Sequence, residues 1–200
     1  ILTLFPYTTL FRSKVLLPLA IGFEEIEAIT IVDILRRASV EVVMGSLEGL
    51  HVKGAHGIEV IADSLLCELE HQDFDMIVLP GGLPGATNLA KDSKVQSLLQ
   101  DFDKANKHIA AICAAPLALK SAGVLKNHYT CYPSFENQIK HQGYNADINV
   151  VCDANITTSK GPSTAIEFTL KLVEILCGEE MAQKLSKDLL LIKKIGDRTC

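Results

Sequence analysis

The chain has 200 residues, of which 48% are apolar and 22% charged, and its formal net charge at pH 7 is -5. This length suits one compact α/β domain with an ample core and leaves no room for a second domain. The negative charge and the absence of a long run of Lys and Arg argue against nucleic acid as a main partner, and they give no reason to expect binding to a membrane surface. No segment offers the ~20 uninterrupted apolar residues of a membrane span.

The two ends of the chain differ from the middle. Residues 1–13 lack the basic start and the small-residue cleavage site of a signal peptide. Residues 3–13 look like the translation of a common sequencing-library adapter, so we expect 1–13 to be a non-native extension outside the fold. The alternative is a genuine N-terminal extension that packs on the domain. The domain is then predicted to span 14–191, followed by a polar, mobile tail at 192–200.

The predicted elements begin with a strand, a helix and a second strand. Residues 15–20 are an apolar run that contains Pro18, which a buried strand tolerates where no ladder donor is needed. Residues 24–38 place apolar side chains at helical spacing, with acidic residues first and basic residues last, as the helix dipole prefers. Residues 40–45 are rich in β-branched residues. This unit predicts a parallel sheet with a right-handed crossover.

The rest of the chain continues the alternation. We expect a hairpin at 51–62 and further strands at 76–79, 108–112, 130–132, 148–151 and 156–158. We expect helices at 86–90, 91–107, 135–141, 163–176 and 179–185, the fourth opened by Gly161-Pro162 and stopped by Gly178.

Cys113 stands where the apolar strand 108–112 meets a predicted helix. Strand, tight turn and helix form a nucleophile elbow, in which the small residues Ala114 and Ala115 suit the crowded backbone and Pro116 suits the first helical turn. The positive end of the helix dipole would favour the thiolate of Cys113. The alternative is a buried structural cysteine beside an apolar strand.

Six cysteines are scattered along the chain without a Cys-x-x-Cys pair: Cys67, Cys113, Cys131, Cys152, Cys177 and Cys200. Neither a zinc cluster nor a disulfide framework is indicated, so a reducing cytoplasm is the expected location. The spacing of the histidines is not that of metal ligands, and we therefore predict no catalytic metal.

Three loops should meet at the carboxyl ends of the strands of such a sheet, where ligand-binding and catalytic sites lie. Glutamates follow the first strand, Pro80-Gly81-Gly82 follows the strand 76–79, and Cys113 follows the strand 108–112. The amides of Gly82 and Ala114 would form an oxyanion hole. A carboxyl group beside the thiol would act as general acid or base, or hold a protonated oxygen against an oxidised sulfur.

Only one or two of Glu24, Glu25 and Glu27 can point at Cys113, because neighbouring helical side chains are about 100° apart. All three also fit a simpler reading, as surface acids that stabilise the start of the helix. For Glu25 we favour that reading.

Four motifs in this order resemble the DJ-1/PfpI family, over residues 14–191. They are 22–27 (GFEEIE), 79–86 (LPGGLPGA) with Asn88-Leu89, 110–116 (AAICAAP) and 158–165 (TSKGPSTA). The resemblance implies a flavodoxin-like, doubly wound, mostly parallel sheet sandwiched by helices, without a cofactor. It also implies that Cys113 is the reactive, oxidation-prone cysteine, Glu27 the acid that contacts it, and Gly82 and Ala114 the amide donors. Glu24 and Gly81 would belong to the same pocket.

Two departures from the family matter. Branches that resemble proteases place His directly after the cysteine, and Ala114 stands there instead, which disfavours a Cys-His protease. A His supplied by a later loop in another branch is replaced by Tyr132, which donates hydrogen bonds but is a poor base at neutral pH. His128 is a nearby substitute by sequence, although a surface role is more common there. His56 is expected to approach the pocket from the hairpin, across a dimer interface.

We arrive at two hypotheses of different classes. The first is a cysteine-dependent, cofactor-free glyoxalase or deglycase, a lyase or hydrolase of the glyoxalase III or protein-deglycase type, which acts on 2-oxoaldehydes such as methylglyoxal and on their adducts. The second is a stress-protective redox sensor whose function is the oxidation of Cys113 without significant turnover. Relatives in this family are commonly homodimers, and a homodimer is expected here, with no nucleic acid or membrane partner.

Overall fold

The structure is a computed structural model that describes residues 13–191. The strands are β1 (Lys14–Leu19), β2 (Glu41–Ser46), β3 (His51–Lys53), β4 (Glu59–Ile61), β5 (Ser64–Leu65), β6 (Met76–Leu79), β7 (His108–Ile112), β8 (Val150–Asp153) and β9 (Ile156–Ser159). The α-helices are α1 (Glu25–Arg37), α2 (Gly85–Lys91), α3 (Ser93–Lys104), α4 (Pro116–Ser121), α5 (Glu136–Ile139), α6 (Ala165–Cys177) and α7 (Glu179–Asp188). Three 3-10 helices are η1 (Leu66–Glu68), η2 (His71–Asp73) and η3 (Pro162–Thr164).

Seven strands form one sheet in the order β5-β2-β1-β6-β7-β9-β8, and β3 and β4 form a separate two-stranded sheet. Within the large sheet, only the pairing of β8 with β9 is antiparallel. Pro18 fits into β1 because the ladder with β6 ends at the Leu16–Ile77 pair, before the proline. The expected doubly wound, mostly parallel sheet is confirmed.

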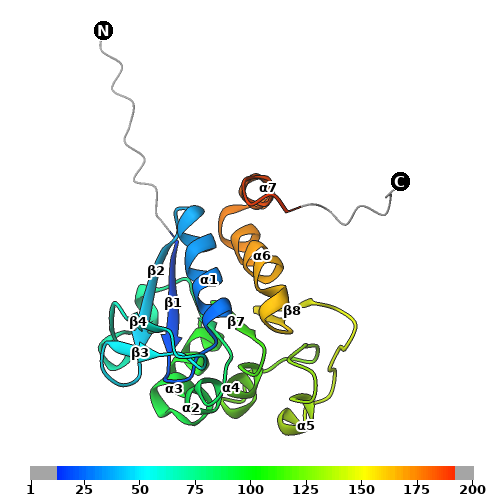
Figure 1. Cartoon of the computed structure of the whole chain (residues 1–200). Helices are drawn as coiled ribbons and strands as arrows, with labels where there is room; N and C mark the ends of the chain where they lie inside the picture. The colour runs from blue at the N-terminus through cyan, green and yellow to red at the C-terminus, as the bar shows by residue number, and fades with distance from the viewer. Residues whose placement is uncertain (1–12, 192–200) are drawn as a thin grey trace.

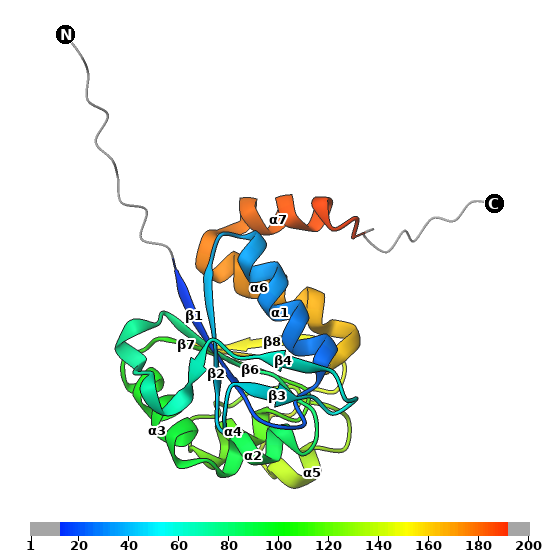
Figure 2. The same ribbon diagram turned by 60° about the vertical axis from the view of Figure 1, so that its left-hand side comes forward.

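Helices cover both faces of the sheet. In Figures 1 and 2, α1 and α6 lie side by side on one face with α7 beside them, while α2, α3 and α4 lie on the other. The inward side chains of α1, among them Ile31 and Leu35, are fully buried against this core. Their burial from water is the main driving force for this arrangement.

Most of the predicted elements are found within a few residues of their expected bounds, but three details are wrong. Residues 130–132 form no strand, because Tyr129 makes only an isolated bridge with Tyr144 and the Tyr132 amide donates to Cys113 instead. The helix expected from residue 91 starts at Ser93, because the Asp92 side chain caps it by accepting from the Val95 amide. The short strand β5 was not expected.

The strand order places the candidate site. The chain runs from β1 to β2 on one side and later to β6 on the other, so the order reverses between β1 and β6. Ligand sites of such sheets lie at the carboxyl ends of the strands beside this reversal. The loops after β1, β6 and β7 therefore converge, as expected.

Two expectations concern parts outside this description. The extension expected at 1–13 falls, except for Ser13, outside the described residues, as does the tail expected at 192–200. Among the residues that are described, we find no helix with the length and apolar character needed to cross a membrane.

Candidate active site

Cys113 occupies a left-handed backbone conformation, with φ at 64°, directly after β7. A residue with a side chain rarely adopts this conformation, and neighbouring hydrogen bonds must hold it in place. The Cys113 amide donates to the Ser159 carbonyl over 2.9 Å, and the Ala115 amide donates to the Ile112 carbonyl over 3.0 Å. Pro116 begins α4. The expected elbow is therefore present.

The Cys113 sulfur is almost buried, with 8% of the residue exposed. The backbone N–H groups of Gly82 and Ala114 donate hydrogen bonds to it, and these lower the thiol pKa. Burial and the neighbouring Glu27 carboxyl outweigh them and raise this pKa above its ordinary value. The expectation of a thiolate favoured by a helix dipole is thus wrong, because α4 has only six residues and the sulfur lies away from water.

Glu27 lies on the inner face of α1 with its side chain fully buried. Its Oε2 atom accepts a hydrogen bond from the Gly81 amide over 2.8 Å, and its Oε1 atom has no hydrogen-bond partner. Burial raises the pKa of this carboxyl to about 7. The carboxyl interacts directly with the Cys113 thiol. An acid with such a pKa can give and take a proton near neutral pH.

Gly81 allows the Cys113 thiol and the Glu27 carboxyl to approach each other closely. A Cβ atom added to it would lie 2.5 Å from Cys113 Cβ and 2.8 Å from Glu27 Oε2. No side chain fits between the two groups, so a glycine is required here. Gly81 thus contacts both groups.

Glu24 is the N-cap of α1, and its Oε2 atom accepts a hydrogen bond from the Glu27 amide over 2.7 Å. This cap satisfies a donor of the first turn and fixes the direction in which Glu27 leaves the helix. Glu24 also lines the cavity above Cys113. The placement that the sequence predicted for Glu24 and Glu27 is therefore found.

Glu25 is buried, so the surface role that we favoured for it is wrong. Its carboxylate accepts hydrogen bonds from the His56 amide at 2.7 Å, from the Ile58 amide at 3.3 Å and, through its other oxygen, contacts His56 Nδ1 at 2.9 Å. Burial raises the Glu25 pKa, but these hydrogen bonds outweigh it and hold the pKa below its ordinary value. Glu25 therefore anchors the β3–β4 loop at the site.

The start of α1 and the β3–β4 loop together bring three possible cation ligands close to one another. One atom each of Glu24, Glu25 and His56 lie within 4.8 Å of one another. The hydrogen bond between His56 and Glu25 raises the pKa of His56. These side chains already bond to each other and to the backbone. The hydrogen bonds that hold the loop therefore explain why they lie together.

A cavity of about 360 Å³ opens above Cys113. It is lined by Glu24, Ala55, His56, Gly82, Leu83, Cys113, Ala114, Tyr132 and Phe135. Most of these are predicted site residues, but three were not expected from the sequence. The missed residues are Ala55, Leu83 and Phe135. The only signal for them in the sequence is that each stands within three residues of a predicted site residue.

Tyr132 is held beside the elbow by a hydrogen bond from its amide to the Cys113 carbonyl over 2.9 Å. His128, which was considered as a substitute base, lies elsewhere. It is exposed and lines a different cavity, with Asn127, Lys140 and His141 among its neighbours. His56 lines the Cys113 cavity from the hairpin, as expected, but it does so within one copy of the chain and not across a dimer interface.

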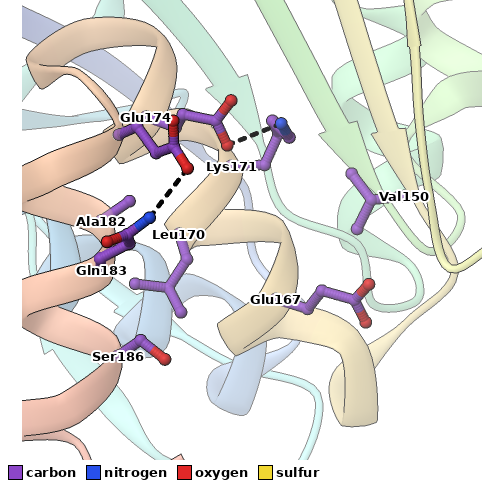
Figure 3. A pocket seen from close by; sticks show the side chains of 9 residues that line it. Val150, Glu167, Leu170, Lys171, Glu174, Ala182, Gln183 and Ser186 are labelled. Atoms are coloured by element: carbon purple, nitrogen blue, oxygen red, sulfur yellow. Dashed lines mark hydrogen bonds and ion pairs between the residues drawn. The ribbon is translucent and has the colours of Figure 1, made fainter. Parts of the chain in front are cut away.

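A further cavity of about 380 Å³ lies between α6, α7 and β8. Figure 3 shows Lys171 and Gln183 each joined to a carboxylate, while Glu167 and Ser186 stand apart from them. Lys171 donates to Glu174 over 2.7 Å, and Gln183 donates to Glu179 over 2.8 Å. No cysteine or histidine lines this cavity. Of these two cavities, the one above Cys113 holds the nucleophile that the sequence predicted.

Comparisons with known proteins find relatives of this chain. A sequence model of the DJ-1/PfpI family matches residues 13–175. The chain is 41% identical to Protein dj-1beta of Drosophila melanogaster over 182 residues, which cover 90% of this chain and 97% of that protein. A crystal structure of Drosophila DJ-1beta superposes with a TM-score of 0.87 at 40% identity, covering 91% of this chain and all of that one.

One further relative is much longer than this chain, and another carries the name of an enzyme. The chain is 38% identical to Protein DJ-1 homolog B of Arabidopsis thaliana, of which it spans only 43%, while 92% of this chain is covered. It is also 38% identical to a Caenorhabditis elegans protein named glutathione-independent glyoxalase DJR-1.2, with 85% of this chain and 91% of that protein covered.

Proposed function

Because this chain belongs to the DJ-1/PfpI family, we propose that it is a cofactor-free glyoxalase that converts small 2-oxoaldehydes such as methylglyoxal into 2-hydroxy acids. The observation that carries this proposal is the pair formed by the Cys113 thiol and the buried Glu27 carboxyl. A nucleophile and a proton carrier meet there beside two amide donors. The name of the glyoxalase relative, DJR-1.2, supports the same choice.

The first step is addition of the sulfur to the aldehyde. The thiol proton passes to the Glu27 carboxylate, and the sulfur then forms a bond to the aldehyde carbon while the carbonyl π bond breaks. The oxygen that gains the electron pair accepts hydrogen bonds from the amides of Gly82 and Ala114. Glu27 then gives its proton to this oxygen, which completes a hemithioacetal and restores the Glu27 carboxylate.

The second step moves hydrogen between the two substrate carbons. Glu27 removes the proton from the carbon bonded to sulfur and returns a proton to the neighbouring carbon, through an enediolate. The first carbon is thereby oxidised to a thioester and the second reduced to an alcohol, so no external oxidant is needed. Water then cleaves the thioester, releasing the 2-hydroxy acid and the Cys113 thiolate. Hydrolysis of 2-oxoaldehyde adducts, the deglycase reaction, would use the same groups.

The test is lactate formation from methylglyoxal by the purified chain and by Cys113→Ser. We expect the substitution to abolish turnover, because the hydroxyl is a far weaker nucleophile at neutral pH. Equal rates for the two proteins would remove the proposal.

A second candidate function is redox sensing through Cys113. The amides on the sulfur and the protonatable Glu27 beside it would also stabilise a sulfinate. Mass spectrometry after mild peroxide treatment separates the two functions. Selective addition of two oxygen atoms at Cys113, in a protein without glyoxalase turnover, would favour sensing.

We also propose that the chain forms a homodimer through the outer face of α1. Ile26 and Ile29 on this helix are 59% and 44% exposed, and Ile21 in the preceding loop is 48% exposed. Large apolar side chains gathered on one face mark a protein contact. A second copy is the natural occupant, since such interfaces are usually formed by the same patch of both subunits.

A reducing, cytoplasmic location is part of the same proposal. In the part of the chain that the structure describes, Cys67, Cys113, Cys131, Cys152 and Cys177 are all free thiols. Thiols remain free most readily in a reducing compartment. A thiol nucleophile also requires such conditions for turnover.

A further inference from the structure

Above Cys113, the cavity has an apolar wall formed by Leu83, Tyr132 and Phe135. Leu83 is 53% exposed and Tyr132 is 47% exposed, so a large part of each side chain faces water. Phe135 is mostly buried behind them. Surface of this kind is favourably covered by an apolar group of a ligand.

This wall is fixed to the elbow. The Tyr132 amide donates to the Cys113 carbonyl over 2.9 Å, and the Phe135 amide donates to the Tyr132 carbonyl over 3.0 Å. Leu83 directly follows Gly82, whose amide contacts the Cys113 sulfur. A substrate bonded to the sulfur would therefore have its substituent beside these side chains.

The cavity is large for methylglyoxal. Its volume of about 360 Å³ corresponds to roughly twelve water molecules at ~30 Å³ each. Methylglyoxal has one methyl group beside its two carbonyls and leaves most of this space filled with water. An aromatic ring would displace that water and cover the apolar wall.

The polar lining argues against a charged substituent. Glu24 is the carboxylate of the lining, and Glu27 lies behind the sulfur. The imidazole Nδ1 of His56 is already engaged with Glu25. A substrate that carries a carboxylate would therefore meet the Glu24 carboxylate, while His56, the basic side chain of this lining, is already paired with Glu25.

We propose that the preferred substrates are neutral 2-oxoaldehydes with a bulky apolar substituent, such as an aryl group, which packs against Leu83, Tyr132 and Phe135. This inference rests on the proposed glyoxalase function and names its substrate class. The chemical steps are unchanged, and phenylglyoxal would give mandelate as methylglyoxal gives lactate.

The test compares kcat/KM for phenylglyoxal and methylglyoxal in the full chain and in variants of the wall. Burial of the ring should favour phenylglyoxal by about tenfold or more. Because the two aldehydes also differ in intrinsic reactivity, the decisive quantity is the change in this ratio between proteins. We expect Leu83→Ala and Phe135→Leu each to lower the ratio about fivefold, and Ile148→Ala, an exposed apolar position outside the cavity, to leave it unchanged.

The outcomes separate the two proposals. Turnover of methylglyoxal with a ratio that the wall variants do not change would overturn the substrate class and leave the glyoxalase function intact. Absence of turnover with both aldehydes would overturn both. Leu83 is half-exposed, so Leu83→Ala removes little packing, and its circular dichroism spectrum shows whether it folds.

Discussion

The Gly81 amide donates a hydrogen bond over 2.8 Å to Oε2 of Glu27, while Oε1 of the same carboxyl is buried without a partner. A carboxylate in this position has one backbone hydrogen bond and its interaction with the Cys113 thiol to offset its loss of water. The protonated form is correspondingly favoured, which explains why its pKa rises to about 7. The hydrogen bond from the loop after β6 favours the charged form of Glu27, and burial of the carboxyl outweighs it.

Replacement of Glu27 by Gln should remove the proton carrier and preserve the shape of the site. We expect kcat/KM for methylglyoxal to fall about a hundredfold or more, the usual effect of losing a general acid or base. Lactate formation is the measurement, with Glu48→Gln in an exposed loop as the control. Retention of full activity by Glu27→Gln would contradict the assigned role.

The stability of the fold should depend on pH through Glu27. Its pKa lies at about 7 in the folded protein and near 4.5 when exposed, so the folded state binds this proton more tightly. The stabilisation of the fold that comes from this tighter proton binding is fully present below pH 4.5 and is lost as the pH rises through 7. The difference in pKa corresponds to about 3 kcal/mol.

Urea unfolding of the wild type and of Glu27→Gln between pH 4.5 and 8 measures this contribution. Because Gln does not titrate, we expect the wild type to lose stability relative to the variant as the pH rises. Free energies of unfolding that run parallel for the two proteins over this range would count against the raised pKa.

Replacement of Gly81 by Ala should force Cys113 and Glu27 apart. The added Cβ would lie 2.5 Å from Cys113 Cβ, closer than two carbons can approach without displacement. We expect a loss of about 2 kcal/mol of stability from overpacking, together with a large loss of activity. Gly49→Ala is the control, because Gly49 has open space around it and its positive φ of 60° costs only about 1 kcal/mol. A fully active Gly81→Ala would show that the close approach is dispensable.

Replacement of Glu25 by Ala should release the β3–β4 loop. The amides of His56 and Ile58 would lose their shared acceptor, at a cost of about 2 kcal/mol. Urea unfolding gives the loss of stability, and faster hydrogen exchange at these two amides locates it. Glu59→Ala on the same hairpin removes only an exposed contact with His51 and should change the stability by less than about 1 kcal/mol.

Replacement of Ile26 by Glu should dissociate the proposed dimer. A charge in the centre of an apolar contact loses its hydration without gaining a partner. Light scattering coupled to size-exclusion chromatography would then give the monomer mass for Ile26→Glu, and the dimer mass for the wild type and for Ile148→Glu, another exposed apolar position. A wild type that elutes as a monomer would exclude the dimer.

The amino-acid sequence by itself determined the succession of strands and helices, because the apolar runs and periodic patterns are local. It also indicated the elbow, since Cys113 directly follows a strand and precedes Pro116. The positions of Glu24 and Glu27 near the sulfur followed from the family motifs and from the rule that strand ends converge. These features depend on residues close together in the chain or on a general property of parallel sheets.

Only the tertiary structure decided the environment of each group. Glu25 is a buried anchor because a hairpin 31 residues later supplies its hydrogen bonds. The Cys113 pKa rises because the fold buries the sulfur beside a carboxyl from a distant helix. The apolar wall arises because the loop that holds Leu83 meets the distant segment that holds Tyr132 and Phe135. Burial and electrostatic interactions depend on contacts between segments far apart in the chain, and local sequence patterns do not specify those contacts.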